Sequence, residues 1–370
     1  MGLEIGSGGG PSGRPRAVRV AGGLAALAAV LGLPLLGAAL AGASVDSRLA
    51  FPPATDVVEK PGFSWWAAGP LLVAGIATVA AAGWRVIAVG RSGDVRPSVD
   101  RRFPWWGWVG FALMVVAWTV AWMRPEVLGP LQRHTFTPLW LGYVLTMGGL
   151  TFYRAGSCLM VRSPRLVGSL FLLSALFWWV FEYLNRFVQN WNYQGPGEMS
   201  GLEYFLMATP PFATVLPAVT VSTELLATWP RLRRAFAVPL PEDAAVARPF
   251  GAALIMGSAV GLLGMGAWPD YVFPLVWVAP LLLLSGVSLL RSGRLPFAPC
   301  DSGGWPVLLP CVAALVCGFF WEMWNAGSLA HWEYSVPFVQ RWLLFEMPAL
   351  GYLGYLPFGL ECVAVAALLP

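Results

Sequence analysis

Charged residues are scarce in this chain. Asp, Glu, Lys and Arg make up 11% of its 370 residues, whereas soluble domains carry about 25%. Hydrophobic residues reach 57% and the mean hydropathy is +0.66. This balance argues against a soluble enzyme and indicates a protein that crosses a membrane several times. The net charge of +4 does not indicate nucleic-acid binding, because the basic residues are spread over many loops.

Residues that bind metals, redox groups or nucleotides are also few. The chain has two His and no His-Glu-x-x-His motif, so a zinc site is not expected. It has no Gly-x-x-x-x-Gly-Lys-Ser/Thr loop, which argues against ATP-driven work. Its five Cys form no Cys-x-x-Cys pair, and we interpret them as small packing residues. We therefore expect neither a metal nor a cofactor.

Ten apolar runs are long enough to span a bilayer, at about 17 to 25 residues each. They lie at 18–42, 65–89, 104–123, 137–155, 165–185, 201–228, 249–268, 271–290, 305–325 and 347–369. The first run ends in Ala-Gly-Ala-Ser and also fits a cleaved signal peptide, although its length favours a retained helix. Residues 1–16 are Gly, Ser, Pro and Arg with almost nothing apolar, so we expect a disordered tail.

The basic residues predict the orientation. If the N-terminus is cytoplasmic, 17 of the 23 Lys and Arg fall in cytoplasmic segments. This asymmetry predicts ten spans in the cell membrane with both termini in the cytoplasm.

The second half of the chain repeats the first. Glu182-x-x-Asn185 precedes Trp191-x-Tyr193, and 140 residues later Glu322-x-x-Asn325 precedes Trp332-x-Tyr334. Each copy then has another Glu, a Leu-Pro pair and a later Glu. Duplication explains the recurrence, but it does not explain why both copies keep carboxylates beside hydrocarbon, where ionisable groups are costly.

The repeat suggests a domain organisation. An N-terminal helix pair with a basic cytoplasmic loop occupies residues 17–100, and two four-helix repeats occupy 101–230 and 248–370. Four spans per repeat is an even number, so both copies enter the membrane in the same sense. The expected fold is an all-α polytopic membrane helix bundle of about ten transmembrane helices.

The repeated acids are the candidate catalytic residues, namely Glu182, Glu203, Glu322 and Glu346. A spacing of i,i+3 places Glu182 and Glu322 on one helix face with Asn185 and Asn325, an arrangement that suits proton transfer. The alternative for these helix ends is an aromatic belt at the headgroups. Glu203 and Glu346 have an alternative structural role, because an acid favours the start of a helix.

Other repeated residues are candidates for a substrate pocket. They are Asn185, Asn325, Trp191, Tyr193, Trp332, Tyr334, Glu224 and Glu361. The Trp-x-Tyr pairs offer ring faces that stabilise cations, or alternatively anchor the chain at the interface. Glu361 lies deep in the last run with nothing basic near it in sequence, so it is expected to be protonated or paired across helices.

The order of Trp-x-Tyr and an acid about ten residues later, at the head of a Pro-containing span, resembles the integral-membrane lycopene cyclase domains. The matching residues are Trp191, Tyr193 and Glu203 in one copy and Trp332, Tyr334 and Glu346 in the other. The resemblance implies tandem multi-span units that protonate an isoprenoid double bond. The chain departs from that family because the paired Glu-Glu is absent and Glu346 precedes its Pro.

Three functions remain open at this point. The first is an intramembrane acid-base enzyme acting on a lipid or isoprenoid, with the four acids around one cavity in the outer half of the membrane. The second is a secondary transporter or proton-coupled carrier that uses Glu224 and Glu361. The third is a non-catalytic scaffold. The expected partner is a membrane lipid or another hydrophobic small molecule, and the pattern does not predict an oligomeric state.

Overall fold

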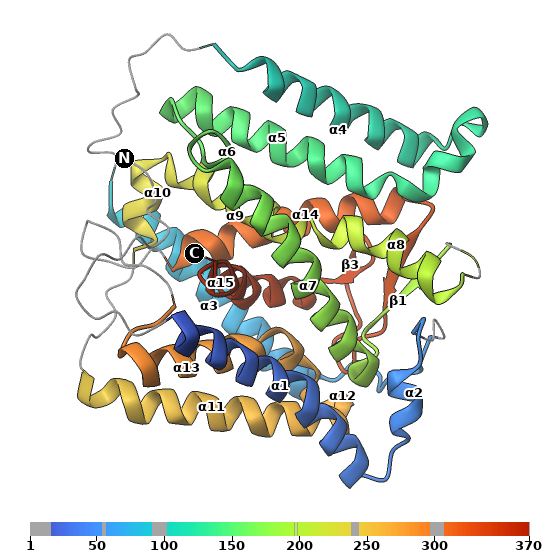
Figure 1. Cartoon of the computed structure of the whole chain (residues 1–370), viewed down its shortest axis with the longest axis vertical. Helices are drawn as coiled ribbons and strands as arrows, with labels where there is room; N and C mark the ends of the chain where they lie inside the picture. The colour runs from blue at the N-terminus through green and yellow to red at the C-terminus, as the bar shows by residue number, and fades with distance from the viewer. Residues whose placement is uncertain are drawn as a thin grey trace.

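A computed structural model describes residues 16–53, 57–90, 102–195, 197, 199–237, 244–296 and 307–369. The described residues are 76% helical and form no closed sheet, and Figure 1 shows the helices packed as one bundle. The expected tail falls almost wholly outside the described residues, as do most of the basic loop before residue 102 and Cys300. The other four Cys are buried and free.

Each of the ten apolar runs contains helix. The long helices are α1 (Arg16–Leu40), α3 (Trp65–Ala88), α4 (Trp105–Met123), α5 (Phe136–Ala155), α7 (Pro164–Val188), α11 (Ala244–Ala267) and α14 (Leu308–Gly327). The other three runs are interrupted and form α8 (Gly201–Phe212) with α9 (Val215–Ala227), α12 (Pro269–Val272) and η2 (Phe273–Trp277) with α13 (Ala279–Ser292), and η3 (Ala349–Gly354) with α15 (Tyr355–Ala366). Short elements connect them, namely α2 (Val45–Leu49), η1 (Glu126–His134), α6 (Leu159–Arg162) and α10 (Pro230–Ala235).

Eight helices in the described part of the chain are long and apolar enough to cross a membrane. The number becomes nine if α12–η2 and α13, which meet at a 54° bend, form one span. The expected count of ten is therefore not confirmed. The run without a matching candidate is α5, whose buried face includes Gly, Thr, Trp and Tyr. Small and polar residues of this kind suit a helix that packs against other helices rather than against lipid.

The outer surface of the bundle is apolar. In α3, which has a mean hydropathy of 1.8, only 6% of the most apolar stretch is buried. Trp66 is 94% exposed and Val73 is 67% exposed, and in α7 Leu172 is 75% exposed. A soluble monomer rarely exposes so much contiguous apolar surface. The fold therefore fits an integral membrane protein.

Two tight helix pairs flank a central group of helices. The pair α4–α5 lies on one side and α11–α13 on the other, with α7, α9, α14 and α15 between them (Figure 1). Glycine permits the close approach within each pair. A Cβ atom at Gly142 would lie 2.7 Å from the Gly110 carbonyl oxygen, and one at Gly286 would lie 2.6 Å from the Gly251 carbonyl oxygen.

Helix α1 packs on α11 in the same manner. A Cβ atom at Gly37 would lie 1.9 Å from the Leu263 carbonyl oxygen, and one at Gly266 would lie 2.0 Å from the Pro34 carbonyl oxygen. Backbones this close leave no room for side chains between them. The first apolar run is therefore an integral part of the described bundle.

Two short strands bring the repeated motifs together. Strand β1 (Trp191–Gln194) pairs antiparallel with β2 (His331–Tyr334), so that Trp191 faces Tyr334 and Tyr193 faces Trp332. A hairpin joins β3 (Leu343–Leu344) to β4 (Met347–Pro348). Both strand pairs lie at the same end of the bundle as α8 (Figure 1).

Candidate functional site

Each Trp-x-Tyr strand is fixed by the Asn of its own motif. Asn185 donates its amide N–H to the Trp191 carbonyl at 2.8 Å, and its oxygen accepts the Trp191 backbone N–H at 3.4 Å. Asn325 forms the same two hydrogen bonds with the backbone carbonyl and N–H of Trp332, each at 2.7 Å. The two Asn residues therefore position the strands, and neither lines the cavity described below.

Glu182 lies at the centre of the first half of the site and is 3% exposed. Its Oε1 atom accepts three hydrogen bonds. The Tyr193 hydroxyl donates at 2.7 Å, and the indoles of Trp178 and Trp191 each donate at 3.1 Å. Three side-chain donors on one oxygen form a preorganised pocket for negative charge.

Glu322 occupies the equivalent place in the second half and is fully buried. Its Oε1 atom accepts hydrogen bonds from the hydroxyls of Tyr334, at 2.8 Å, and Tyr355, at 2.7 Å. The Trp332 indole donates to the Tyr334 hydroxyl at 2.8 Å and so extends the chain of hydrogen bonds. The Oε2 atom of Glu322 is buried and has no hydrogen-bond partner within the described chain.

The two halves differ in which residue donates to the carboxylate. Trp178, the indole donor to Glu182, corresponds to Gly318, which lies 140 residues later. Val215 corresponds in the same way to Tyr355. A Cβ atom at Gly318 would lie 2.5 Å from the Tyr355 ring. Gly318 thus provides the space in which Tyr355 replaces the missing indole donor. Each carboxylate therefore has side-chain donors, but an indole donor in the first half is replaced by a phenol donor in the second half.

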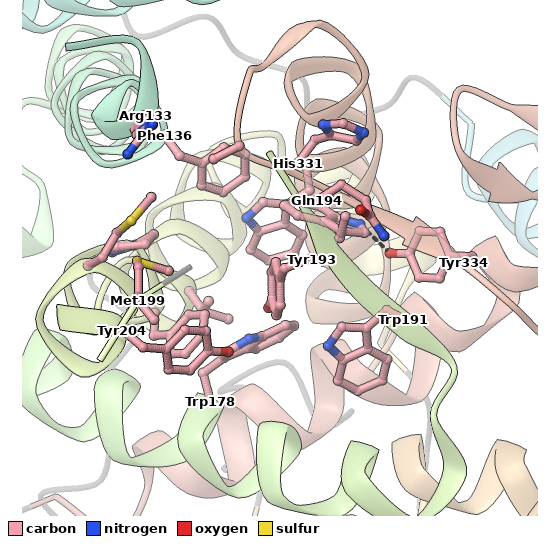
Figure 2. Close-up of a pocket in the computed structure, with 18 of the residues that line it drawn as sticks. Arg133, Phe136, Trp178, Trp191, Tyr193, Gln194, Met199, Tyr204, His331 and Tyr334 are labelled. Atoms are coloured by element: carbon pink, nitrogen blue, oxygen red, sulfur yellow. Dashed lines mark hydrogen bonds between the residues drawn. The ribbon is translucent and has the colours of Figure 1, made fainter. Parts of the chain in front are cut away.

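An aromatic cavity of about 140 Å³, the first cavity, lies against these donors. Its lining includes Trp178, Trp191, Tyr193, Tyr204, Phe212, Trp277, Trp321, Trp332, Tyr334 and Tyr355. Figure 2 shows Arg133 and His331 at one side of the cavity and Trp178 and Trp191 at the opposite side. The carboxylates of Glu182 and Glu322 do not line it, so phenols and indoles separate them from an occupant.

The phenols of both strands are hydrogen-bond donors. Burial, followed by the negative charge of Glu182, raises the pKa of Tyr193 well above its usual value. Burial and then Glu322 raise the pKa of Tyr334 in the same direction. Both hydroxyls therefore keep their protons at neutral pH and donate to the carboxylates.

The other two candidate acids have different surroundings. Glu203 is exposed at the start of α8 and forms a capping box with Ser200, each side chain bonding the backbone of the other residue. Glu346 lies in the turn between β3 and β4 rather than at a helix start, because Pro348 ends β4 before η3 begins. Neither lines the first cavity, although Glu346 is close enough to Glu322 to interact electrostatically.

The two later acids differ from each other. Glu224 accepts the Arg162 guanidinium at 2.7 Å and the Leu159 backbone N–H at 2.9 Å, so it ties α9 to α6. Glu361 is fully buried in α15, and neither of its oxygens has a hydrogen-bond partner within the described chain. Neither acid lines the first cavity.

Several residues that line the first cavity were not among the predicted site residues, namely Trp178, Tyr204, Trp277, Trp321 and Tyr355. Trp178 and Trp321 flank the repeated acids and were available as a signal. Tyr355 was harder to find, because it donates to Glu322 in place of a residue that differs between the two copies. A search for identical residues in the repeats necessarily overlooks such an exchange.

In comparisons with known proteins, no family model, curated protein or solved structure matches the chain. Within the described ranges, no group of three or more His, Cys, Asp or Glu side chains is arranged to hold a metal ion.

Proposed function

We propose that this integral membrane protein is an acid-base enzyme that acts on an apolar, lipid- or isoprenoid-like molecule in the first cavity. One observation carries the proposal. In both halves of the site, a buried Glu bonds the phenol of its own Trp-x-Tyr strand, and that phenol lines the cavity. Lipid anchoring alone does not require both copies to retain such a pair.

The two halves suit different steps. A phenol can accept one proton while it donates another, whereas an indole N–H only donates. For Glu322 to supply a proton, it must itself be protonated, and the hydroxyl of Tyr334 or Tyr355, which donates to it in the structure, must turn toward the substrate. That phenol then takes up the proton of Glu322 as it releases its own to the substrate. Glu182 is held mainly by indoles, and it would receive the proton that the product loses, through Tyr193.

The proposed reaction leaves the atoms balanced. A proton adds to one carbon of a carbon–carbon double bond, and a cation forms on the adjacent carbon. Indole faces of Trp191 and Trp321 are suited to stabilise that cation. Loss of a proton from another carbon, with or without ring closure, then gives an isomer of the substrate.

The resemblance to lycopene cyclase domains supports this proposal only in part. The Trp-x-Tyr residues, which match that family, line the first cavity. The acids in the matching positions, Glu203 and Glu346, do not line it. We therefore assign the proton transfer to Glu182 and Glu322.

We also propose the finer architecture of ten spans in two parallel repeats after an N-terminal helix pair, with both termini cytoplasmic. Its support is the 17-to-6 distribution of basic residues and the 140-residue spacing. Reporter fusions after Arg102, Arg165, Arg234 and Arg294 are expected to read cytoplasmic in all four cases. Two external readings would contradict the orientation and the parallel repeat.

A second candidate function is a proton-coupled carrier, and Glu361 is the observation that favours it. A buried carboxyl group without a partner can take up and release a proton, as carriers require. The ion pair of Glu224 with Arg162 weakens this alternative, because the corresponding acid of the other repeat is already engaged.

One experiment separates these functions. Purified protein is placed in vesicles made from the lipid extract of the cells that produce it, and the lipids are separated by liquid chromatography, which resolves isomers, and identified by mass spectrometry. An enzyme is expected to convert one species into an isomer of equal mass with time. A carrier would leave the lipids unchanged and dissipate an imposed pH gradient, and a scaffold would do neither.

A further inference from the structure

A second cavity of about 220 Å³ adjoins the first. The two cavities share four aromatic side chains, those of Trp191, Trp277, Tyr334 and Tyr355. Most of the remaining lining is aliphatic or proline, from η2, from the segment after β2 and from η3. The second cavity is thus a largely apolar space beside the strand pair, and nothing in the sequence predicted it.

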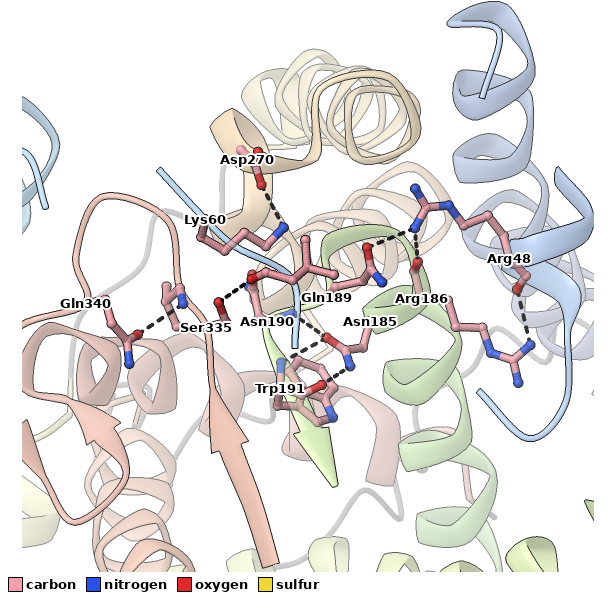
Figure 3. A network of polar contacts seen from close by, with 12 residues as sticks. Arg48, Lys60, Asn185, Arg186, Gln189, Asn190, Trp191, Asp270, Ser335 and Gln340 are labelled. Carbon is pink, nitrogen blue, oxygen red and sulfur yellow. Dashed lines mark hydrogen bonds and ion pairs between the residues drawn. The ribbon is translucent and has the colours of Figure 1, made fainter. Parts of the chain in front are cut away.

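Asn190 is the polar exception in this lining. It is 3% exposed, and its Oδ1 atom has no hydrogen-bond partner within the described chain. Its backbone is fixed on both sides: its N–H bonds Asn185 Oδ1 at 2.8 Å, and its carbonyl accepts the Ser335 N–H at 2.8 Å (Figure 3). The side chain is therefore held in place without a protein partner of its own.

Three other polar side chains that line the second cavity have hydrogen-bond partners outside it. The hydroxyls of Tyr334 and Tyr355 bond Glu322, and the indole of Trp191 bonds Glu182. An unpaired buried amide costs free energy unless something supplies the missing hydrogen bond. An occupant with one hydroxyl group would do so, because a hydroxyl both donates and accepts.

We propose that the second cavity binds an apolar molecule that carries a single hydroxyl group, with Asn190 bonding that hydroxyl and the hydrocarbon portion among Phe273, Val336 and Leu350. The proposal is independent of catalysis in the first cavity. An anionic headgroup is not expected there, because the described lining contains no Lys, Arg or His.

The test uses two photoactivatable ten-carbon probes, an alcohol and the matched hydrocarbon without the hydroxyl. The full-length protein in detergent is labelled with each, and the labelled peptides are mapped by mass spectrometry. The alcohol is expected to label the wall formed by residues 347–357 about fivefold more efficiently than the hydrocarbon, which corresponds to one net hydrogen bond. Equal labelling by the two probes would overturn the proposal.

Asn190→Leu is the matched variant, because Leu has a similar size and no amide. It should label equally with both probes, and persistence of the alcohol preference would also overturn the proposal. Its thermal midpoint should not fall, since the Asn190 side chain makes no hydrogen bond in the described chain. If the variant does not fold, the two-probe comparison on the native protein still decides the question. Alcohol labelling without any lipid conversion would contradict the proposed function alone.

Discussion

Replacing Glu322 by Gln is expected to lower the rate of lipid conversion at least about 100-fold, the usual contribution of a positioned acid or base. Glutamine keeps the volume of the side chain and an oxygen that accepts from Tyr334 and Tyr355, but it cannot carry the transferable proton. The protein should therefore fold and insert normally. The rate is measured from the chromatographic time course of substrate and product, and folding from the thermal midpoint in detergent.

Glu203→Gln is the matched control for this substitution. It also removes one carboxylate, but Gln can occupy the same position of a capping box, so the start of α8 should persist. Its rate is expected to equal that of the unmodified protein. If Glu203→Gln is as damaging as Glu322→Gln, the loss reflects charge or folding in general, and the assignment of Glu322 is wrong.

Tyr355→Phe separates the relay from the carboxylate. The variant keeps the ring that fills the space beside Gly318 and removes only the hydroxyl. Because Tyr334 still bonds Glu322, we expect a smaller loss than for Glu322→Gln. A full rate in this variant would leave Tyr334 as the sole route for the proton.

Asn325→Leu is expected to have the largest effect on stability. Asn325 is fully buried, and its amide satisfies the backbone N–H and carbonyl of Trp332. Leu would leave both backbone groups without a partner, at about 1–3 kcal/mol each, so the total loss is about 2–6 kcal/mol. The free energy of unfolding is measured by titration with sodium dodecyl sulfate, and β2 should lose its place beside Glu322.

Asn190→Leu provides the control for stability. The residue is almost as buried as Asn325, yet its side chain bonds no described group. The same substitution there should leave the free energy of unfolding unchanged or slightly increased. Equal destabilisation at positions 190 and 325 would mean that the amide of Asn325 does not hold β2.

The sequence predicted the components of the site better than their arrangement. The length of the apolar runs located the ten helical segments, and the repeated motif identified Glu182, Glu322 and both Trp-x-Tyr pairs. Local patterns could not show that β1 pairs with β2, because that contact joins residues about 140 positions apart. Nor could they distinguish Glu203, a helix cap, from Glu182, since both acids lie near apolar runs.

Proton transfer is the central claim, and incubation in D₂O tests it most directly. The lipid-conversion experiment is repeated with the native protein in vesicles equilibrated with D₂O, and the product mass is compared with that formed in H₂O. Because the added proton comes from Glu322 through a phenol that exchanges with solvent, the product should gain one deuterium per turnover. A product that forms at the usual rate without deuterium would contradict acid-base chemistry at Glu182 and Glu322.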